Sequence, residues 1–336
     1  MTTSILKRRP KNSIPLVPLT SEAYSDWLAS QDAATKAWAK AGGFGARSGE
    51  ILMLPGKDRS LSAIAFGYER GDILWSFAGL ASRLNAGNYH IDAELPDDAA
   101  GVAVLGWLIG GYSFDRYKAK PDEGGAKLLA PKNADTALAE ALAAATFTVR
   151  DLINTPANDM GPSSLAKAAQ GLARRFDAKV KVIKGDGLLK SNFPLVHSVG
   201  RASSDAPRLI DLRWGKRGAK ITLVGKGVCF DSGGLDLKSA SNMLLMKKDM
   251  GGGAHVLGLA EAIMATGLAV RLRVLVPAVE NAVAGNAFRP LDVLESRKGI
   301  SVEIGNTDAE GRLILADALT LASEDKPDLL LDFGEP

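Results

Sequence analysis

Three glycine-rich segments of the chain combine carboxylates with lysines in a pattern that could hold divalent metal ions. They are Val224–Lys238 (VGKGVCFDSGGLDLK), Leu244–Gly253 (LLMKKDMGGG) and Asn306–Arg312 (NTDAEGR). Asp231 and Asp249 stand among apolar residues and glycines, so a folded core around them would bury their charges. A buried carboxylate has to be paired or bind a cation, because removing an ionised group from water is costly.

The residue types in these segments indicate a site for two ions. Carboxylates without nearby histidines suit hard or borderline ions such as Mg²⁺, Mn²⁺ or Zn²⁺. Two such ions close together need bridging carboxylates, and they make a hydroxide nucleophile at neutral pH. A lysine could be a ligand only when neutral, and we expect burial and an adjacent dication to lower its pKa.

The last segment could also bind an anion. Asp308, Glu310 and Arg312 alternate, so in an extended stretch two acids and one guanidinium share a side. The start of the helix expected after them would add free N–H groups, which favour an anion beside Arg312.

Several other catalytic motifs are missing from the sequence. It contains no HExxH pattern, no GxSxG elbow and no Walker A motif. His90 could join Asp92 and Glu94 on one strand face as a metal site, but we interpret it as part of a polar strand edge before Pro96. His255 is interpreted as a packed structural residue.

The composition is that of an ordinary soluble globular protein, with 46% hydrophobic and 24% charged residues. The formal net charge of +3 gives no strong field for nucleic acid. The single cysteine, Cys229, excludes an internal disulfide and fits a reducing compartment; its apolar neighbours indicate a buried thiol. The N-terminus lacks the apolar core of a signal peptide, and the longest apolar stretch, Gly101–Tyr112, is too short to cross a bilayer. We therefore expect a cytoplasmic protein without a membrane partner.

The elements that must position the three segments follow from hydrophobic spacing. Strands are predicted at residues 14–19, 50–54, 63–67, 179–183, 209–213, 221–225, 270–276 and 329–333. Helices are predicted at residues 33–41, 74–84, 99–111, 134–152, 165–176 (capped by Ser163 or Ser164), 254–265 and 313–323. Such alternation favours an α/β fold with a largely buried sheet, whose ligands gather beyond the carboxyl ends of the strands. Three parts are predicted: an N-terminal α/β domain at residues 1–146, a linker and connecting helix at 147–176, and a catalytic domain at 177–336.

The motifs resemble those of the leucyl aminopeptidase (cytosol aminopeptidase) family. NTDAEGR resembles that family's signature and VGKG-x-x-FDSGG its partner motif. The resemblance extends less sharply to NTPAND, to RPLDVL and to the N-terminal domain. It implies an N-terminal α/β domain followed by a larger α/β catalytic domain with a central mixed sheet flanked by helices.

The resemblance also implies a role for each matching residue. It implies a metal-ligand set of Lys226, Asp231, Asp249, Asp308 and Glu310, in which Asp231 and Glu310 bridge two ions. Lys238 would polarise the scissile carbonyl, and Arg312 would hold a bicarbonate that acts as general base. Met246 would line the pocket for the first side chain of the substrate.

The implied protein is a homohexameric metallo-aminopeptidase that removes leucine-like N-terminal residues from peptides. The implied ions are Mn²⁺ or Zn²⁺, with Mg²⁺ or Co²⁺ as alternatives. After residues 329–333 the family continues into an ATLTG loop, whereas this chain reads Gly334–Pro336. We therefore interpret the chain as C-terminally truncated, with an incomplete catalytic domain and an open sheet edge. Two alternatives remain: a weak or inactive relative with a binding or assembly role, and a two-metal hydrolase acting on another amide.

Overall fold

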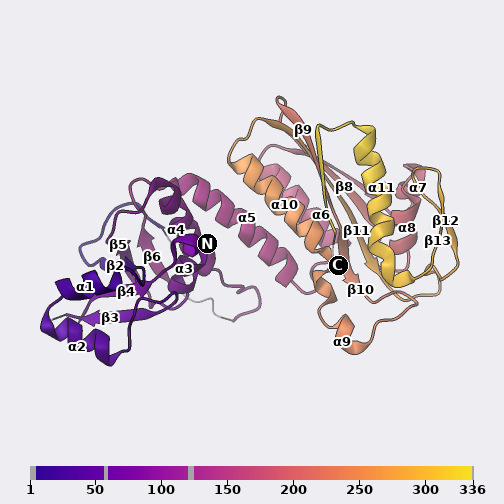
Figure 1. The fold of residues 1–336 in the computed structure, drawn as a ribbon. Coiled ribbons are helices and arrows are strands. Elements are labelled where there is room, and N and C mark those ends of the chain that lie inside the picture. Colours follow the sequence, from indigo (N-terminus) through magenta and orange to yellow (C-terminus); the bar gives the residue numbers. More distant parts are fainter. Residues whose placement is uncertain (1–4, 57–59, 120–124, 335–336) are drawn as a thin grey trace. The chain divides into compact units, whose positions relative to one another are not determined.

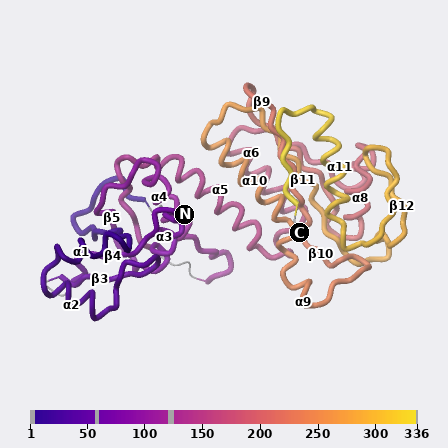
Figure 2. Tube along the Cα trace, in the orientation of Figure 1, coloured from indigo at the N-terminus to yellow at the C-terminus, as the bar shows by residue number. Residues whose placement is uncertain are grey.

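The computed structural model describes residues 5–56, 60–119 and 125–334, and the chain divides into two compact units, residues 1–143 and 144–336. Figures 1 and 2 show the elements of both units. Glu335 and Pro336, which belong to the predicted departure from the family, lie outside the described residues.

The first unit contains a six-stranded sheet with strand order β1-β6-β5-β2-β4-β3. All neighbours pair in parallel except β3, which runs antiparallel to β4. The strands are β1 (Ile5–Leu6), β2 (Ile14–Leu19), β3 (Ile51–Pro55), β4 (Leu61–Gly67), β5 (Gly87–Ile91) and β6 (Ala126–Leu129). The helices are α1 (Tyr24–Ser30), α2 (Ala33–Ala41), α3 (Ile73–Ala81), preceded by the 3₁₀ turn η1 (Arg70–Asp72), and α4 (Asp97–Gly110).

Glycines bring α3 and α4 into close contact. A Cβ atom at Gly106 would lie 2.2 Å from the carbonyl oxygen of Leu74, and one at Gly110 would lie 2.1 Å from that of Ala78. Both glycines therefore have a packing reason, because any side chain would push the helices apart. Beneath α3, Phe77 meets Phe66 of β4 edge to face, with ring centroids 5.2 Å apart.

The second unit is built on a mixed sheet with order β14-β9-β11-β8-β7, and β10 also pairs with β11. Strands β14, β9, β10 and β11 are parallel, whereas β8 and β7 add antiparallel pairings. The strands are β7 (Lys179–Lys184), β8 (Arg208–Trp214), β9 (Ala219–Gly225), β10 (Gly227–Asp231), β11 (Val270–Asn281) and β14 (Leu329–Phe333), with a separate hairpin of β12 (Val293–Glu295) and β13 (Ser301–Glu303). Helix α5 (Thr136–Asn154) contains residues of both units. The other helices of the second unit are α6 (Pro162–Arg175), α7 (Gly187–Lys190), α8 (Pro194–Gly200), α9 (Ala240–Met243), α10 (Gly251–Ala265) and α11 (Glu310–Glu324), with 3₁₀ turns η2 (Met246–Met250) and η3 (Thr307–Ala309).

Helices cover both faces of this sheet, as Figure 1 shows. Val274 and Val276 of β11 pack in the core under α6 and α10, while Leu275 packs against α11. Successive side chains of a strand point to opposite faces, so a strand covered on both sides must be apolar throughout. This explains the unbroken apolar run in β11, and the predicted α/β class with a mixed, helix-flanked sheet is confirmed.

Most predicted elements agree with the structure to within a few residues, but two local predictions are wrong. The N-cap of α6 is Gly161, and the Ser163 N–H donates instead to Oδ2 of the distant Asp205 at 2.7 Å. His90 is buried rather than at a polar edge, since β5 lies between β6 and β2; its ring nitrogens meet Ser13 Oγ at 2.7 Å and Arg9 Nη2 at 2.5 Å.

The structure also bears on the cysteine and on the apolar character of the helices. Cys229 is buried, and burial raises the pKa of its thiol. Among the described residues, none of the helices combines the length and apolar character needed to span a bilayer.

Candidate metal centre

The first lysine of the site, Lys226, is the single residue that separates strands β9 and β10. Its N–H donates to the carbonyl of Phe333 at 2.9 Å, and its carbonyl accepts from the Gly253 N–H at 2.7 Å. The backbone is therefore held from β14 and from α10. This point is the carboxyl end of β9, where ligands of α/β sheets gather.

Lys226 reaches two carboxylates from different elements. Its Nζ lies 2.6 Å from Asp249 Oδ1 in η2 and 3.3 Å from Glu310 Oε1 at the start of α11. All three residues are buried. The side chain crosses over Gly311, where a Cβ atom would lie 2.5 Å from Lys226 Cε, so glycine leaves the space that this lysine occupies.

Lys238 makes a second, matching cluster. Its Nζ lies 2.5 Å from Asp308 Oδ1 and 3.1 Å from Asp231 Oδ2. Asp231 is buried at the end of β10, while Asp308 and Lys238 are half-buried. Each lysine is thus shared between two carboxylates.

The carboxylates converge on one point. Oxygens of Asp231, Asp308 and Glu310 all lie within 4.8 Å of one another. In the described part of the chain, Asp249 Oδ2 and Glu310 Oε2 are buried and have no hydrogen-bond partner. Four carboxylates and two ammonium groups leave a net formal charge of −2. Buried oxygens that lack a donor, in a cluster with negative charge, fit hard divalent cations.

Burial and charge act in opposite directions on these groups. Burial raises the pKa of the Asp249, Glu310 and Asp308 carboxyls, although the neighbouring lysine acts against it in each case. Burial by itself would lower the pKa of Lys226, yet Asp249 and Glu310 outweigh it and the net direction is upward. Burial thus lowers the pKa of Lys226 as expected, but the two carboxylate partners, which the expectation did not include, raise it by more.

Two buried polar residues that the sequence did not point to hold the carboxylate loops. Asn281, at the end of β11, donates from Nδ2 to Asp231 Oδ1 at 2.8 Å and to the Thr307 carbonyl at 3.0 Å. The Thr307 hydroxyl donates to the Gly233 carbonyl at 2.7 Å and accepts from the Asp236 N–H at 2.8 Å. A polar residue ending a long apolar strand was the available signal for Asn281.

The segment from Asn306 to Arg312 is not extended. The expectation that Asp308, Glu310 and Arg312 share one side depended on an extended backbone. The Asn306 side chain accepts from the Asp308 N–H at 2.7 Å, and a 3₁₀ turn leads directly into α11 at Glu310. Two residues apart in an α-helix, Glu310 and Arg312 point about 200° apart. Arg312 is exposed and makes no side-chain hydrogen bond or ion pair with the described residues. Met246 is half-buried in η2, on the same 3₁₀ turn as Asp249.

His255, interpreted as a packed residue, is exposed on α10 instead. Its Nδ1 lies 2.7 Å from the carbonyl oxygen of Gly251, one turn earlier in the same helix. It takes part in none of the ion pairs of the carboxylate cluster.

The chain matches family models over both units. Residues 147–335 match the catalytic domain of the cytosol aminopeptidase family, and residues 14–131 match the M17 aminopeptidase N-terminal domain. Among curated relatives, the probable cytosol aminopeptidase of Streptomyces coelicolor is 40% identical over 76% of this chain and 55% of its own length. That of a Sulfurihydrogenibium species is 34% identical over 86% of this chain and 63% of its own length.

Solved structures agree with these matches. The cytosol aminopeptidase of Coxiella burnetii superposes with a TM-score of 0.93 at 46% identity, covering 98% of this chain and 72% of that one. The bottromycin maturation enzyme BotP, in complex with Mn, gives a TM-score of 0.85 at 30% identity and covers 96% and 72%. The chain spans about half to two thirds of the length of the first curated relatives. On the domain models, the identities and the fold, the chain belongs to the cytosol aminopeptidase family.

Proposed function

We propose that this protein is a metal-dependent aminopeptidase that removes N-terminal residues, leucine-like ones preferred, from peptides. The observation that carries the proposal is the cluster of four carboxylates and two lysines at the carboxyl ends of β9 and β10. Family membership supports the same reaction, since the relatives are named as probable cytosol aminopeptidases.

The proposed ligands of two divalent ions are Lys226, Asp231, Asp249, Asp308 and Glu310, with Asp231 and Glu310 bridging. The unpartnered buried oxygens and the net negative charge support this set. Mn²⁺ or Zn²⁺ are proposed, with Mg²⁺ or Co²⁺ as alternatives, and the Mn complex of BotP makes Mn²⁺ the first choice for a test. When bound, such ions supply Lewis acidity that activates water at neutral pH and holds the free amine of the substrate.

Three other residues complete the proposal. Lys238 would polarise the scissile carbonyl and stabilise its oxyanion, because its ammonium already lies among the carboxylates of the cluster. Arg312 would hold bicarbonate as general base, and its exposed guanidinium is not engaged by the described residues. Met246 would line the first side-chain pocket, since residues three apart in a 3₁₀ turn lie on one side and Asp249 is three residues on.

The resemblance to the same family also supports a proposal on assembly and location. We propose a cytoplasmic homohexamer that acts on peptides. Light scattering coupled to gel filtration measures the oligomeric state directly, and a monomer at all concentrations would contradict the hexamer.

The first test measures metal binding and turnover on the same preparation. Calorimetry with Mn²⁺ should give two sites per chain, and the loaded protein should hydrolyse leucine p-nitroanilide in bicarbonate buffer. Two bound ions without hydrolysis under Mn²⁺, Zn²⁺, Mg²⁺ or Co²⁺ would favour the weak or inactive relative with a binding role. Absence of bound ions would overturn the metal site itself.

A sharper test leaves every donor in place. In Gly311→Ala the new methyl group would lie 2.5 Å from Lys226 Cε, so the lysine must move away from Asp249 and Glu310. We expect at least a tenfold loss of Mn²⁺ affinity, because the displaced ammonium no longer lies beside Asp249 and Glu310. The melting temperature, measured alongside, shows whether the variant still folds. Gly305→Ala is the matched control, since a Cβ atom there meets open space. Equal Mn²⁺ affinity in the two variants would remove Lys226 from the ligand set.

A further inference from the structure

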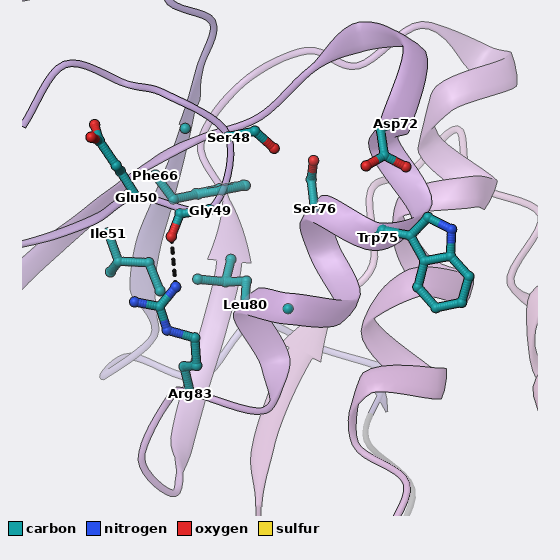
Figure 3. A pocket seen from close by; sticks show the side chains of 12 residues that line it. Ser48, Gly49, Glu50, Ile51, Phe66, Asp72, Trp75, Ser76, Leu80 and Arg83 are labelled. Atoms are coloured by element: carbon teal, nitrogen blue, oxygen red, sulfur yellow. Dashed lines mark hydrogen bonds between the residues drawn. The ribbon is translucent and has the colours of Figure 1, made fainter.

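A cavity in the first unit, remote in sequence from the metal cluster, has the form of a small ligand site. It has a volume of about 140 Å³ and lies between the loop that precedes β3, the strand β4 and the helix α3 (Figure 3). This is below the roughly 300–1,000 Å³ of pockets for drug-sized ligands. A ligand smaller than a drug-sized molecule therefore suits it.

The floor of the cavity is apolar and one buried hydroxyl faces it. Phe66 and Leu80 are 1% and 2% exposed. Ser76 lines the cavity and is 8% exposed, and its Oγ has no hydrogen-bond partner among the described residues. In the view of Figure 3 the Ser76 hydroxyl lies between the hydroxyl of Ser48 and the carboxylate of Asp72, and no dashed line reaches it. A buried hydroxyl without a partner is unfavourable, so a ligand that donates or accepts there would satisfy it.

The two ends of the cavity carry opposite charges. Asp72 is the N-cap residue of α3, Ser76 and Leu80 follow at four-residue spacing on one face of the helix, and Arg83 lies in the turn after its end, so the acid comes first and the base last. Asp72 makes no side-chain hydrogen bond or ion pair within the described ranges. Arg83 Nη1 donates to the Gly49 carbonyl at 2.6 Å, which fixes the guanidinium at the rim.

The spacing of these charges suits a short ligand. The nine residues of α3 lie between Asp72 and Arg83 and cover roughly 14 Å, and the long arginine side chain can shorten the distance between the two charges. Two extended residues span about 7 Å. Glu50 also lines the cavity, but its carboxylate is already engaged by Arg47 and by the Gly45 N–H.

One exposed glycine that lines the cavity has no packing reason. Gly79 lies inside α3, where glycine is unfavourable, yet a Cβ atom there would meet nothing within 4 Å. Gly106 and Gly110 differ in this respect, since a side chain at either would collide with α3. Trp75, which also lines the cavity, is 60% exposed and offers a ring face at the rim.

We propose that this cavity binds a short zwitterion whose two charges are separated by a peptide unit, namely a dipeptide. The ammonium group lies at Asp72 and Ser76, the carboxylate lies at Arg83, and the apolar side chain rests on Phe66 and Leu80. The site does not depend on the metal centre or on peptidase activity.

Calorimetry on the 336-residue chain, kept metal-free in EDTA, tests the proposal with glycyl-L-leucine as the probe. N-acetylglycyl-L-leucine lacks the ammonium group and glycyl-L-leucinamide lacks the carboxylate. We expect glycyl-L-leucine to bind, and each charge-deleted compound to bind at least tenfold more weakly. Equal binding of glycyl-L-leucine and glycyl-L-leucinamide would overturn the role of Arg83, and no binding of glycyl-L-leucine would overturn the site.

Variants locate the binding. Gly79→Leu should fill part of the cavity and weaken binding at least tenfold, whereas Gly79→Ala should change it less than twofold. If Gly79→Leu does not fold, Asp72→Asn at a half-buried position is the second variant, and it should weaken binding because it removes the charge that faces the ammonium group. Asp249→Asn should leave zwitterion binding unchanged. If Asp249→Asn abolishes binding while Gly79→Leu preserves it, the ligand binds at the metal cluster and the inference fails.

Discussion

At the residue scale, two lysines with the same kind of partners differ in their access to solvent. Lys226 is 7% exposed between Asp249 and Glu310, whereas Lys238 is half-buried between Asp231 and Asp308. The more accessible ammonium can meet a substrate carbonyl, and the buried one can only meet groups inside the cluster. The difference in burial supports the different roles that we propose for them.

Lys238→Ala should therefore separate catalysis from metal binding. The loss of one oxyanion donor typically lowers kcat by about 10²–10³-fold. Mn²⁺ affinity should fall far less, because four carboxylates and Lys226 remain. The measurement pairs kcat for leucine p-nitroanilide with calorimetric Mn²⁺ affinity, and Lys238→Arg controls for charge. Parallel losses of kcat and affinity would assign Lys238 to the metal ligands instead.

At the element scale, a buried carboxylate joins α11 to α8 on the face of the sheet away from α10. Asp317 is fully buried in α11, and its Oδ2 accepts from the N–H groups of Leu195 and Val196 at 2.9 and 3.3 Å. Its Oδ1 accepts from the Arg297 N–H at 2.8 Å. The first N–H groups of a helix need such partners, so Asp317 fixes how α8 starts. It also orients the helix that begins with Glu310.

Asp317→Asn should lower the free energy of unfolding by about 1–3 kcal/mol at pH 7. The asparagine side chain would place its NH₂ group against backbone N–H donors that Asp317 now satisfies. Burial raises the pKa of Asp317, although the backbone donors act against it. The folded chain thus takes up a proton at higher pH than the unfolded chain. The wild type therefore gains stability as the pH falls through the raised pKa, and the variant does not.

Urea denaturation of both proteins at pH 7 and pH 5 checks this sign. The stability difference should widen at the lower pH. All other carboxylates are common to both proteins and cancel in the comparison. A difference that narrows as the pH falls would show that the ionised carboxylate is the preferred form in the folded chain.

At the scale of the whole molecule, each compact unit has its own sheet and its own core. The proposed metal ligands all belong to the second unit, and the proposed zwitterion cavity belongs to the first. A ligand stabilises only the part whose folded state it binds.

Calorimetric unfolding should therefore show two transitions, of which Mn²⁺ raises one. Saturation at 100 times Kd adds about 2.7 kcal/mol to the unit that binds. Gly106→Ala should lower the other transition, since the methyl group would collide with the Leu74 carbonyl. A single transition that responds to both changes would contradict independent unfolding of the units.

Local sequence predicted the bounds of several elements, the family and the segments that form the candidate site. Spacing of apolar residues located α2 and β14 at their observed bounds, because helix and strand periods depend on neighbours along the chain. The motifs around Asp231 and Asp308 indicated the family, since those segments carry chemistry in a short stretch. The grouping of lysines and acids at strand and helix ends also predicted the edge of the sheet at which these groups meet.

Only the tertiary structure decided which groups meet. Lys226 pairs with Asp249 and Glu310 because β9, η2 and α11 converge, and residues 84 apart have no common local pattern. The Asn306 cap turned an alternating segment into a helix start, so Arg312 does not share the side of Glu310. Asn281 and Thr307 hold the loops through bonds across 26 residues or more. Sequence determines which residues can bind metal, whereas packing of distant elements decides their partners, their burial and hence their charge.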